Sequence, residues 1–541
     1  MRNLTNHSSF ATRRGFGSRG RGSVRRRATW PAGVLGCLLA ANVFNGFCQD
    51  TRDPLLDLMI EKGMLTQEEA RKVRMEADAM RTNAAAISSA SKWKINQAFK
   101  SLEIYGDLRL RYENRQASAP DGSRIELNRE RAALRVGLRG EVVDDFYYGF
   151  RLDTSPNPRS PWVTLGTSSS GVPYQGPFGK STYGLDVGQL YIGWRPSGWL
   201  NLTVGKMDNP IYTTSMVWDT DFAPEGAAER FRYPVGRADF FATFGQFLYQ
   251  DANPSHTAPG LFNLGFDNST PAALLAWQAG LTYHLSERLS FKVAPVLYNY
   301  AGQGVNNNTP GSTQTPAFNG TFVGQGSTNS LSGNTQGWSG YPSGYYDGFT
   351  ANQTGINDLL VLEIPWEFNY KLAKLNLRLF GDYAQNLEGG DRARAAYLAS
   401  RSAFQPVGGG GMALIPSPQT GDTKAYQVGV AVGNQDALGL AYGLTSRKHA
   451  WEARFYWQHV EQYALDANLL DSDFFEGRGN LEGVYSALAY GLTDNVITTL
   501  RYGYASRIND KLGTGGSNQD IPQMNPIQNY HLLQLDLTVK F

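Results

Sequence analysis

The stretch Leu533-Gln534-Leu535-Asp536-Leu537-Thr538-Val539-Lys540-Phe541 ends the chain and decides the fold class. Every odd-numbered residue in it is apolar, and every even-numbered residue is polar or charged. Because successive side chains of a β-strand point to opposite faces, this pattern predicts a strand with one apolar and one polar face. Such a strand fits either a soluble sandwich, with the apolar face in a core, or a membrane barrel, with the apolar face in lipid.

The same period of two begins at Leu102 and continues to the end of the chain. Sixteen strands are expected, an even number, as in single-chain bacterial barrels. Short and long connections alternate, although the connection at 435–447 is longer than a tight turn, so the pairing there stays open. The expected strands are 102–115, 128–142, 146–153, 184–195, 199–206, 228–234, 238–250, 274–285, 288–300, 358–370, 373–386, 424–434, 448–459, 480–491, 495–505 and 530–541.

Residues 1–48 are interpreted as a signal peptide. An arginine-rich stretch precedes an apolar run from Trp30 to Phe47, and polar sequence follows. A twin-arginine signal at Arg13-Arg14 and a lipid anchor at Cys37 remain as alternatives. Cleavage would remove eight of the 50 basic residues and both cysteines, and would leave 42 basic against 48 acidic side chains. This charge balance argues against nucleic-acid binding, and the loss of cysteine argues against disulfides.

Residues 49–101 are expected to form a periplasmic helical segment and linker before the barrel at 102–541. Asp53 and Pro54 suit the start of a first helix, and Thr66-Gln67-Glu68-Glu69 is a capping box for a second helix that reaches about Arg81. The pair of helices is too short to be an independent domain. We therefore expect 53–81 to dock, to oligomerise, or to contact a periplasmic or cell-wall partner.

The alternation of the strands also assigns side chains to the inner face of the barrel. Seven arginines on three neighbouring strands share the polar face, where lipid exposure would cost each about 2–4 kcal/mol at mid-membrane. They are predicted to line the pore as a basic wall, or alternatively to pair with Glu103, Asp107, Glu141 or Asp153 and to hold the wall together. The seven are Arg109, Arg111, Arg129, Arg131, Arg135, Arg139 and Arg151.

The long connection after the fifth strand adds acids to the predicted pore lining. Asp219, Asp221 and Glu225 are expected to lie opposite the arginines, and a transverse field of this kind filters solutes by charge. A calcium site is an alternative for these acids, and Asp471 and Asp473 raise the same question, but neither segment has the ligand set of an EF-hand. We therefore predict no metal site.

Catalytic and cofactor-binding patterns are not found. The six histidines have no serine, acid or metal-ligand partners at suitable spacing, so neither a catalytic site nor a cofactor is predicted. Barrel enzymes of the outer membrane, such as phospholipases or proteases, are the main enzymatic rival, but they need a nucleophile or a water held by a histidine–acid pair. The sequence does not indicate an enzyme.

Several motifs together resemble the putative porin family of Gram-negative outer-membrane β-barrels, which has an N-terminal helical leader. They are Leu55-Leu56-Asp57, Lys62-Gly63-Met64-Leu65-Thr66, Gly205-Lys206-Met207-Asp208-Asn209-Pro210, Trp218-Asp219-Thr220-Asp221, Pro224-Glu225-Gly226 and Asp471-Ser472-Asp473-Phe474. In addition, the final strand and Phe541 resemble the terminal signal that the barrel-assembly machinery recognises. The resemblance implies a channel in the cell outer membrane, in contact with lipid and assembled as a homotrimer.

Two functions are consistent with these features. The first is a porin for passive or weakly selective diffusion of small hydrophilic solutes and ions. The second is a structural or adhesive outer-membrane barrel that anchors the envelope or binds outside partners. A lumen filled by side chains and loops would favour the second function.

Overall fold

The structure of the chain is a computed structural model. The chain divides into two compact units, Met1–Lys94 and Ile95–Phe541, and only the second is described below. The predicted signal peptide and nearly all of the helical segment lie outside the described residues and stay predictions. The structure describes Lys62, Lys72, 98–155, 157, 160–166, 184–249, 272–301, 359–393, 404–407, 411–414, 421–434, 437–510, 512–514, 520–521, 524 and 526–541.

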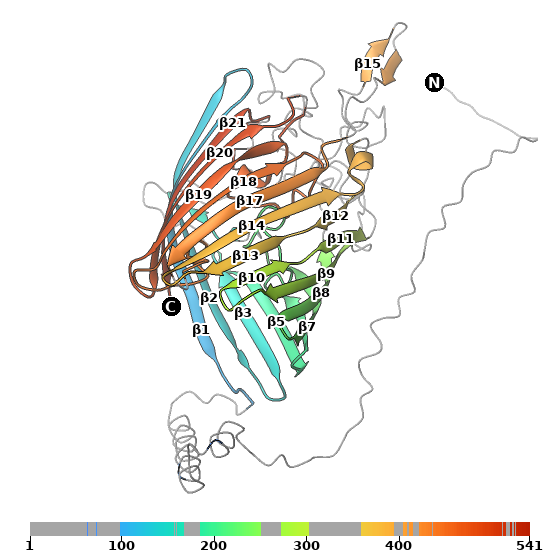
Figure 1. The fold of residues 1–541 in the computed structure, drawn as a ribbon. Helices are drawn as coiled ribbons and strands as arrows, with labels where there is room; N and C mark the ends of the chain where they lie inside the picture. The colour runs from blue at the N-terminus through green and yellow to red at the C-terminus, as the bar shows by residue number, and fades with distance from the viewer. Residues whose placement is uncertain are drawn as a thin grey trace, which may run out of the picture. The chain divides into compact units, whose positions relative to one another are not determined.

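Strands make up most of the described residues, with two short 3-10 helices between them (Figure 1). The helices are η2 (Leu440–Tyr442) and η3 (Phe475–Gly477). The strands are β1 (Glu103–Ser118), β2 (Arg124–Glu141), β3 (Phe146–Asp153), β4 (Val163–Thr164), β5 (Asp186–Ser197), β6 (Leu200–Lys206), β7 (Glu225–Val235), β8 (Ala238–Tyr249), β9 (Ala272–His284), β10 (Leu289–Val293), β11 (Val296–Ala301), β12 (Leu360–Glu363), β13 (Trp366–Lys371), β14 (Leu375–Asn386), β15 (Phe404–Val407), β16 (Gly411–Leu414), β17 (Lys424–Asn434), β18 (Trp451–Val460), β19 (Leu481–Gly491), β20 (Val496–Arg507) and β21 (Asn529–Lys540).

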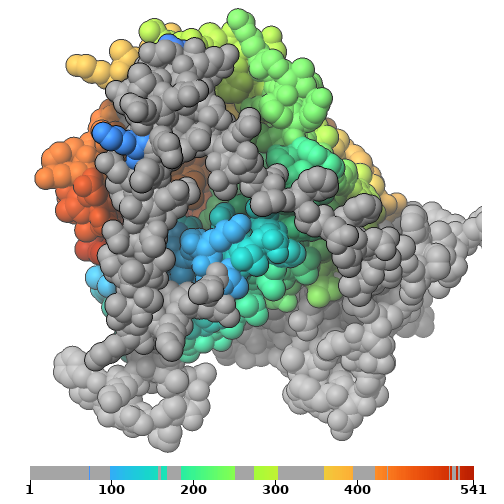
Figure 2. Space-filling view, turned by 90° about the horizontal axis from the view of Figure 1, so that it is seen from below, coloured from blue at the N-terminus to red at the C-terminus, as the bar shows by residue number. Residues whose placement is uncertain are grey.

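The sheet closes on itself. β1 pairs antiparallel with β2 on one side and with β21 on the other, so the first and last strands complete a ring. In the space-filling view of Figure 2, the colours of the described residues pass from blue through green and yellow to orange around the molecule. The predicted closed, antiparallel barrel of 16 strands is confirmed. The short β4 adds a bridge to β2, and β15 and β16 form a separate hairpin.

Two of the sixteen barrel strands are each broken by a proline. The strand expected at 288–300 is divided into β10 and β11 at Pro295, and the strand expected at 358–370 is divided into β12 and β13 at Pro365. Proline has no backbone N–H to give to the ladder, so regular pairing stops there. The carbonyls of both prolines still accept hydrogen bonds, from Ala279 and Ala294 respectively, each at 3.1 Å. The neighbouring strands therefore stay hydrogen-bonded to each other at both breaks.

Burial decides between a soluble sandwich and a membrane barrel. On β21, Leu533, Leu535 and Leu537 are exposed, whereas Gln534 and Asp536 are buried. This is the reverse of a soluble protein, and an outward apolar face with an inward polar face is the pattern of a membrane barrel. Among the described residues, no helix is long and apolar enough to cross a membrane.

Two long connections pack inside the barrel, and they supply most of its buried apolar side chains outside the strands. We call residues 207–224, between β6 and β7, the first inner loop, and residues 461–480, between β18 and β19, the second inner loop. Met216 and Trp218 of the first are buried, as are Leu465 and Phe474 of the second. At the opposite end of the strands, the connection expected at 435–447 contains η2, whose Leu440 and Ala441 are also buried.

Candidate functional site

The inward arginines of β1 meet acids from the second inner loop and from β21. Arg111 Nε lies 2.7 Å from Asp536 Oδ1, and Arg111 Nη1 lies 2.7 Å from Asp473 Oδ1. Arg115 is fully buried; its Nη2 lies 3.1 Å from Glu113 Oε2 and its Nη1 lies 3.3 Å from Glu476 Oε1. The guanidinium groups thus hold the second inner loop against the wall, and we call Arg111, Glu113, Arg115, Asp473, Glu476 and Asp536 the β1 network.

Arg129 and Arg131 of β2 join this network from the neighbouring strand. Arg129 Nε donates to Glu113 Oε1 at 2.7 Å, and Arg129 Nη2 lies 2.6 Å from Asp520 Oδ2. Arg131 Nη1 lies 3.8 Å from Glu113 Oε1, and its Nη2 donates to the carbonyl of Trp162 at 3.4 Å. Glu113 is therefore shared by several guanidinium groups.

The remaining four predicted arginines each have an acid partner as well. Arg109 Nε lies 2.6 Å from Asp107, Arg151 Nε lies 2.7 Å from Asp153, and Arg139 Nε lies 2.7 Å from Glu103 at an exposed position. Arg135 pairs with Asp221 of the first inner loop. Three of the four acids named in the alternative interpretation are thus partners of these arginines, and the fourth, Glu141, pairs with Arg195.

Four of the predicted pore-lining residues are placed differently from the expectation. Arg111, Arg131 and Asp219 are buried and do not face open lumen, because the inner loops and the Trp162 ring cover them; that ring lies 4.2 Å from the Arg111 guanidinium carbon. Glu225 lies in β7 and pairs with Lys206, 2.8 Å away in the adjacent strand, and not with the arginines. Asp221 does meet them, through Arg135.

The two inner loops join each other at Asp219. Its backbone N–H donates to the Leu469 carbonyl at 2.7 Å, and its Oδ2 accepts from the Ser472 N–H at 3.0 Å. Burial, with a contribution from the nearby Asp221, raises the pKa of Asp219 to about 7. Burial and the charges of Asp219 and Asp473 likewise raise the pKa of Asp471. Among the described residues, no group of three or more acids, histidines or cysteines is arranged to hold a metal ion.

The junction at Asp219 should weaken as pH rises. A carboxyl whose pKa is raised by folding stabilises the folded state fully below its ordinary pKa and loses that contribution as pH rises through the folded value, here between about 4 and about 7. In Asp219→Asn the amide cannot ionise. The decrease in thermal stability over this pH range should therefore be smaller than in the wild type, by the contribution of one titrating carboxyl group. The measurement is the temperature of the folded-to-unfolded band shift on gels, run as a pH series.

Acidification acts on the neighbouring pairs in the opposite direction. Burial opposes ionisation of Asp221 and Asp473, but Arg135 and Arg109 lower the pKa of Asp221, and Arg111 and Arg115 lower that of Asp473. Their contribution is present above the ordinary carboxyl pKa and is lost as pH falls through the lowered values.

The matched control for Asp219→Asn is Asp144→Asn, in the exposed turn after β2. An Asp219→Asn slope as steep as that of this control would contradict the assignment.

The first inner loop is also attached to the far side of the barrel. The hydroxyl of Thr213 donates to Glu363 Oε1 at 2.6 Å, and the hydroxyl of Thr214 donates to Asp382. Gln278 of β9 holds the loop backbone at Tyr212: its Oε1 accepts from the N–H at 2.9 Å, and its Nε2 donates to the carbonyl at 2.7 Å. The loop therefore crosses the interior from Arg135 on β2 to the wall at β9, β12 and β14.

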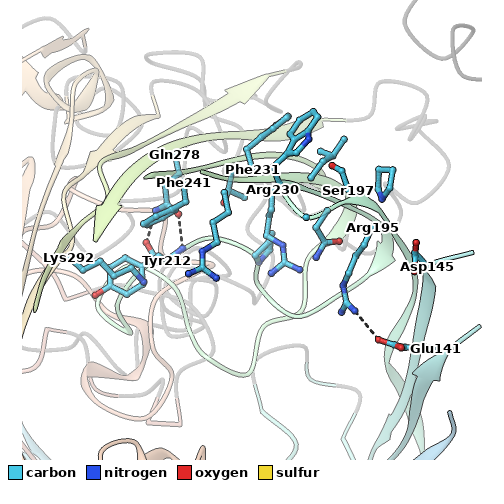
Figure 3. A pocket seen from close by; sticks show the side chains of 18 residues that line it. Glu141, Asp145, Arg195, Ser197, Tyr212, Arg230, Phe231, Phe241, Gln278 and Lys292 are labelled. Atoms are coloured by element: carbon cyan, nitrogen blue, oxygen red, sulfur yellow. Dashed lines mark hydrogen bonds and ion pairs between the residues drawn. The ribbon is translucent and has the colours of Figure 1, made fainter. Parts of the chain in front are cut away.

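A cavity of about 670 Å³ lies between this loop and the wall formed by β5 to β10. Figure 3 shows Tyr212, Arg230 and Lys292 turned towards the same space, with Arg195 and its partner Glu141 on the other side. Asn201, Thr243 and Gln278 add neutral polar groups to the lining. This cavity is water-accessible space inside the barrel, and its lining combines charged and polar side chains with apolar and aromatic ones.

Comparison with known proteins identifies the family. Residues 114–541 match the model of a family described as "Putative porin". The chain belongs to this porin family. The match covers most of the chain and nearly all of the barrel, so this porin is an outer-membrane channel protein by family and by fold, and its outward apolar strands lie against lipid. No curated protein sequence matches the porin.

Solved structures that are similar to the porin are distant from it. OmpF of Salmonella typhi, in complex with daunomycin, has 8% identity and a TM-score of 0.39, with 83% of this chain and 99% of that chain covered. An anion-selective porin of Comamonas acidovorans also has 8% identity and a TM-score of 0.39, over 82% and 99%. A loop-deletion mutant of the outer membrane protein OmpT of Vibrio cholerae has 11% identity and a TM-score of 0.35, over 82% and 99%.

Several interior residues were missed by the sequence reasoning. Glu113, Arg115 and Asp536 were not among the predicted pore-lining residues, although the alternation gives them the same inward face as Arg111. Arg230 and Lys292 have the same inward parity on β7 and β10 and line the cavity. The period of the strands could not show that the second inner loop brings Asp473 and Glu476 to Arg111 and Arg115. It also could not show that no acid of this fully described loop reaches Arg230 or Lys292.

Proposed function

We propose that the porin allows small hydrophilic solutes and ions to diffuse passively through the barrel interior. The observation that carries this proposal is the cavity beneath the first inner loop, which has polar and charged side chains among its lining residues and lies inside a closed barrel with an apolar outer face. The inner loops reduce the cross-section, so the path admits only small solutes. We further propose that charge selection is weak where the arginines of β1 and β2 are neutralised by neighbouring acids.

The channel proposal is tested by electrical measurement. The purified full chain, inserted into a planar bilayer in potassium chloride, should give discrete steps of conductance, and liposomes that contain it should swell in small sugars more than in large ones. Its matched control is the same detergent without protein. Absence of current above this background would overturn the proposal.

A second function is favoured by one specific observation. The second inner loop is packed against the wall through Phe474, Phe475 and the β1 network, which fills part of the lumen, as a barrel that serves only as an anchor would require. In that case the protein would be a structural or adhesive envelope component, with the loops or the segment 53–81 as the contact. The bilayer experiment separates the two functions, because an anchor carries no current.

We also propose a homotrimer, assembled after recognition of the terminal strand by the barrel-assembly machinery. Phe541 closes the ladder: its N–H donates to the Gly106 carbonyl at 3.1 Å, and its side chain stays exposed. Chemical crosslinking in mild detergent should give a ladder that ends at three chains. A single band at one chain would overturn the trimer.

A further inference from the structure

Arg230 faces the cavity without an acid opposite it. Its guanidinium is exposed, and its register partners on β6 and β8 are Asn201 and Thr243, which are neutral. Among the described residues no ion pair is formed by Arg230. Each of the seven arginines of the predicted basic wall does have such a pair, so Arg230 differs from all of them.

Lys292 of β10 is the second cation in the cavity without an ion pair among the described residues. Its ammonium lies 3.4 Å from the centroid of the Tyr212 ring and 5.2 Å from that of Phe241, so aromatic faces hold it. Glu367 lies opposite it in register but is paired with Arg378. Glu367 also attracts the Lys292 ammonium, but Lys292, Arg378 and Glu367 together keep one net positive charge that a solute can meet.

The other charges around the cavity are balanced. Arg195 Nη1 lies 3.0 Å from Glu141 Oε1, and Arg232 Nη2 lies 3.2 Å from Asp239 Oδ2. Asp145 lies 4.0 Å from Lys100. The net positive charge of this cavity thus comes from Arg230 and from Lys292, which shares Glu367 with Arg378.

The lining indicates which kind of anion would be held. Tyr212, Phe241 and Pro210 give apolar and aromatic surface next to the two cations, and Asn201 and Thr243 give hydrogen-bonding groups beside Arg230. A guanidinium binds a carboxylate through charge-assisted hydrogen bonds, and a concave site with a few polar groups in an apolar lining suits a small organic molecule. About 670 Å³ is enough for one aromatic ring with its carboxylate.

We propose that this cavity is a binding site for small aromatic monocarboxylates on the diffusion path. The proposal rests on the proposed channel function. The carboxylate lies at Arg230 and Lys292, and the ring lies against Phe241 and Tyr212 beneath the first inner loop. Transient binding here raises the local concentration of such anions and gives the porin its preference for them.

The experiment compares three solutes on the full-length porin in planar bilayers. Benzoate is expected to reduce the chloride current through open channels at lower concentration than acetate does, because acetate lacks the ring, and benzylammonium is expected to have no such effect. Equal potency of benzoate and acetate would overturn the assignment to aromatic carboxylates.

Substitutions test the two cations. In Arg230→Gln and in Lys292→Gln, the anion-to-cation permeability ratio from reversal potentials should fall about two- to threefold. This is the effect expected when one charge roughly 7 Å from the permeating ion is lost in water. Benzoate should also block both variants less strongly than the wild type. Arg237→Gln removes the same charge from the nearby turn, outside the cavity, and should change neither. If the porin conducts but all three variants have the permeability ratio of the wild type, the proposed binding site is wrong and the proposed channel function is retained. If no variant and no wild-type protein conducts, the channel proposal itself fails.

Discussion

Arg115→Met is expected to lower the free energy of unfolding of the porin by about 3–5 kcal/mol, the cost of removing one partner from a buried ion pair. Arg115 is fully buried and lies beside Glu113, Glu476 and Asp520. Methionine fills much of the space but removes one of the cations that these carboxylates share, and Glu113 and Glu476 are fully buried, so water cannot replace it. The measurement is urea-induced unfolding in lipid, followed by tryptophan fluorescence.

A second result should accompany the loss of stability. Arg115 connects β1 to the second inner loop through Glu476 and through the Asp473 carbonyl, which accepts from Nη1 at 3.1 Å. Without it, this loop should leave the wall more often, and single-channel current should become larger and noisier. The effect on current and the effect on unfolding come from the same contacts.

The control for Arg115 is Arg139→Met. Arg139 pairs with Glu103 at 2.7 Å, a shorter contact than the pairs of Arg115 with Glu113, Glu476 and Asp520, but both partners are more than half exposed. Water and salt screen such a pair, so its loss should change unfolding little. Equal loss of stability in both variants would show that burial of Arg115 does not decide its contribution.

The barrel was predictable because its physical cause is repeated along the chain. Each strand must have apolar residues facing lipid at every second position. Because this pattern occurs in all sixteen strands, their positions could be predicted, with small errors at the strand ends. Phe146–Asp153 and Lys424–Asn434 were predicted at their observed bounds. The breaks at Pro295 and Pro365 could also have been predicted, because proline interrupts any regular ladder.

The interior was less predictable, since parity gives the face of a side chain but not its partner. Arg111 was placed in the lumen by alternation, yet its burial depends on Trp162 and on a loop about 360 residues away in sequence. The second inner loop did carry one usable signal. Tyr463, Leu465, Leu469, Leu470, Phe474 and Phe475 are too many apolar residues for a loop in water, and the structure buries all six.

Trp218→Ala is expected to have the largest effect on the first inner loop. The indole is buried among Phe222, Phe247 and Tyr298, with ring centroids 6.2, 6.1 and 6.1 Å away. Removing a buried aromatic side chain of this size costs about 3–5 kcal/mol, because contacts are lost and a cavity remains. That cost is comparable to what Gln278, Thr213 and Thr214 contribute together, about 1 kcal/mol for each hydrogen bond to the wall.

The loop should therefore spend part of its time detached from β8 and β11, and single-channel conductance should rise while the barrel itself stays folded. Trp218→Phe keeps most of the ring packing and should restore most of the wild-type current. Trp277→Ala removes the same side chain from the outward face of β9 and should leave the current unchanged. If Trp218→Ala conducts like wild type although its folded band melts at a lower temperature, the first inner loop packs against the wall without restricting the path, and the pore runs elsewhere in the lumen.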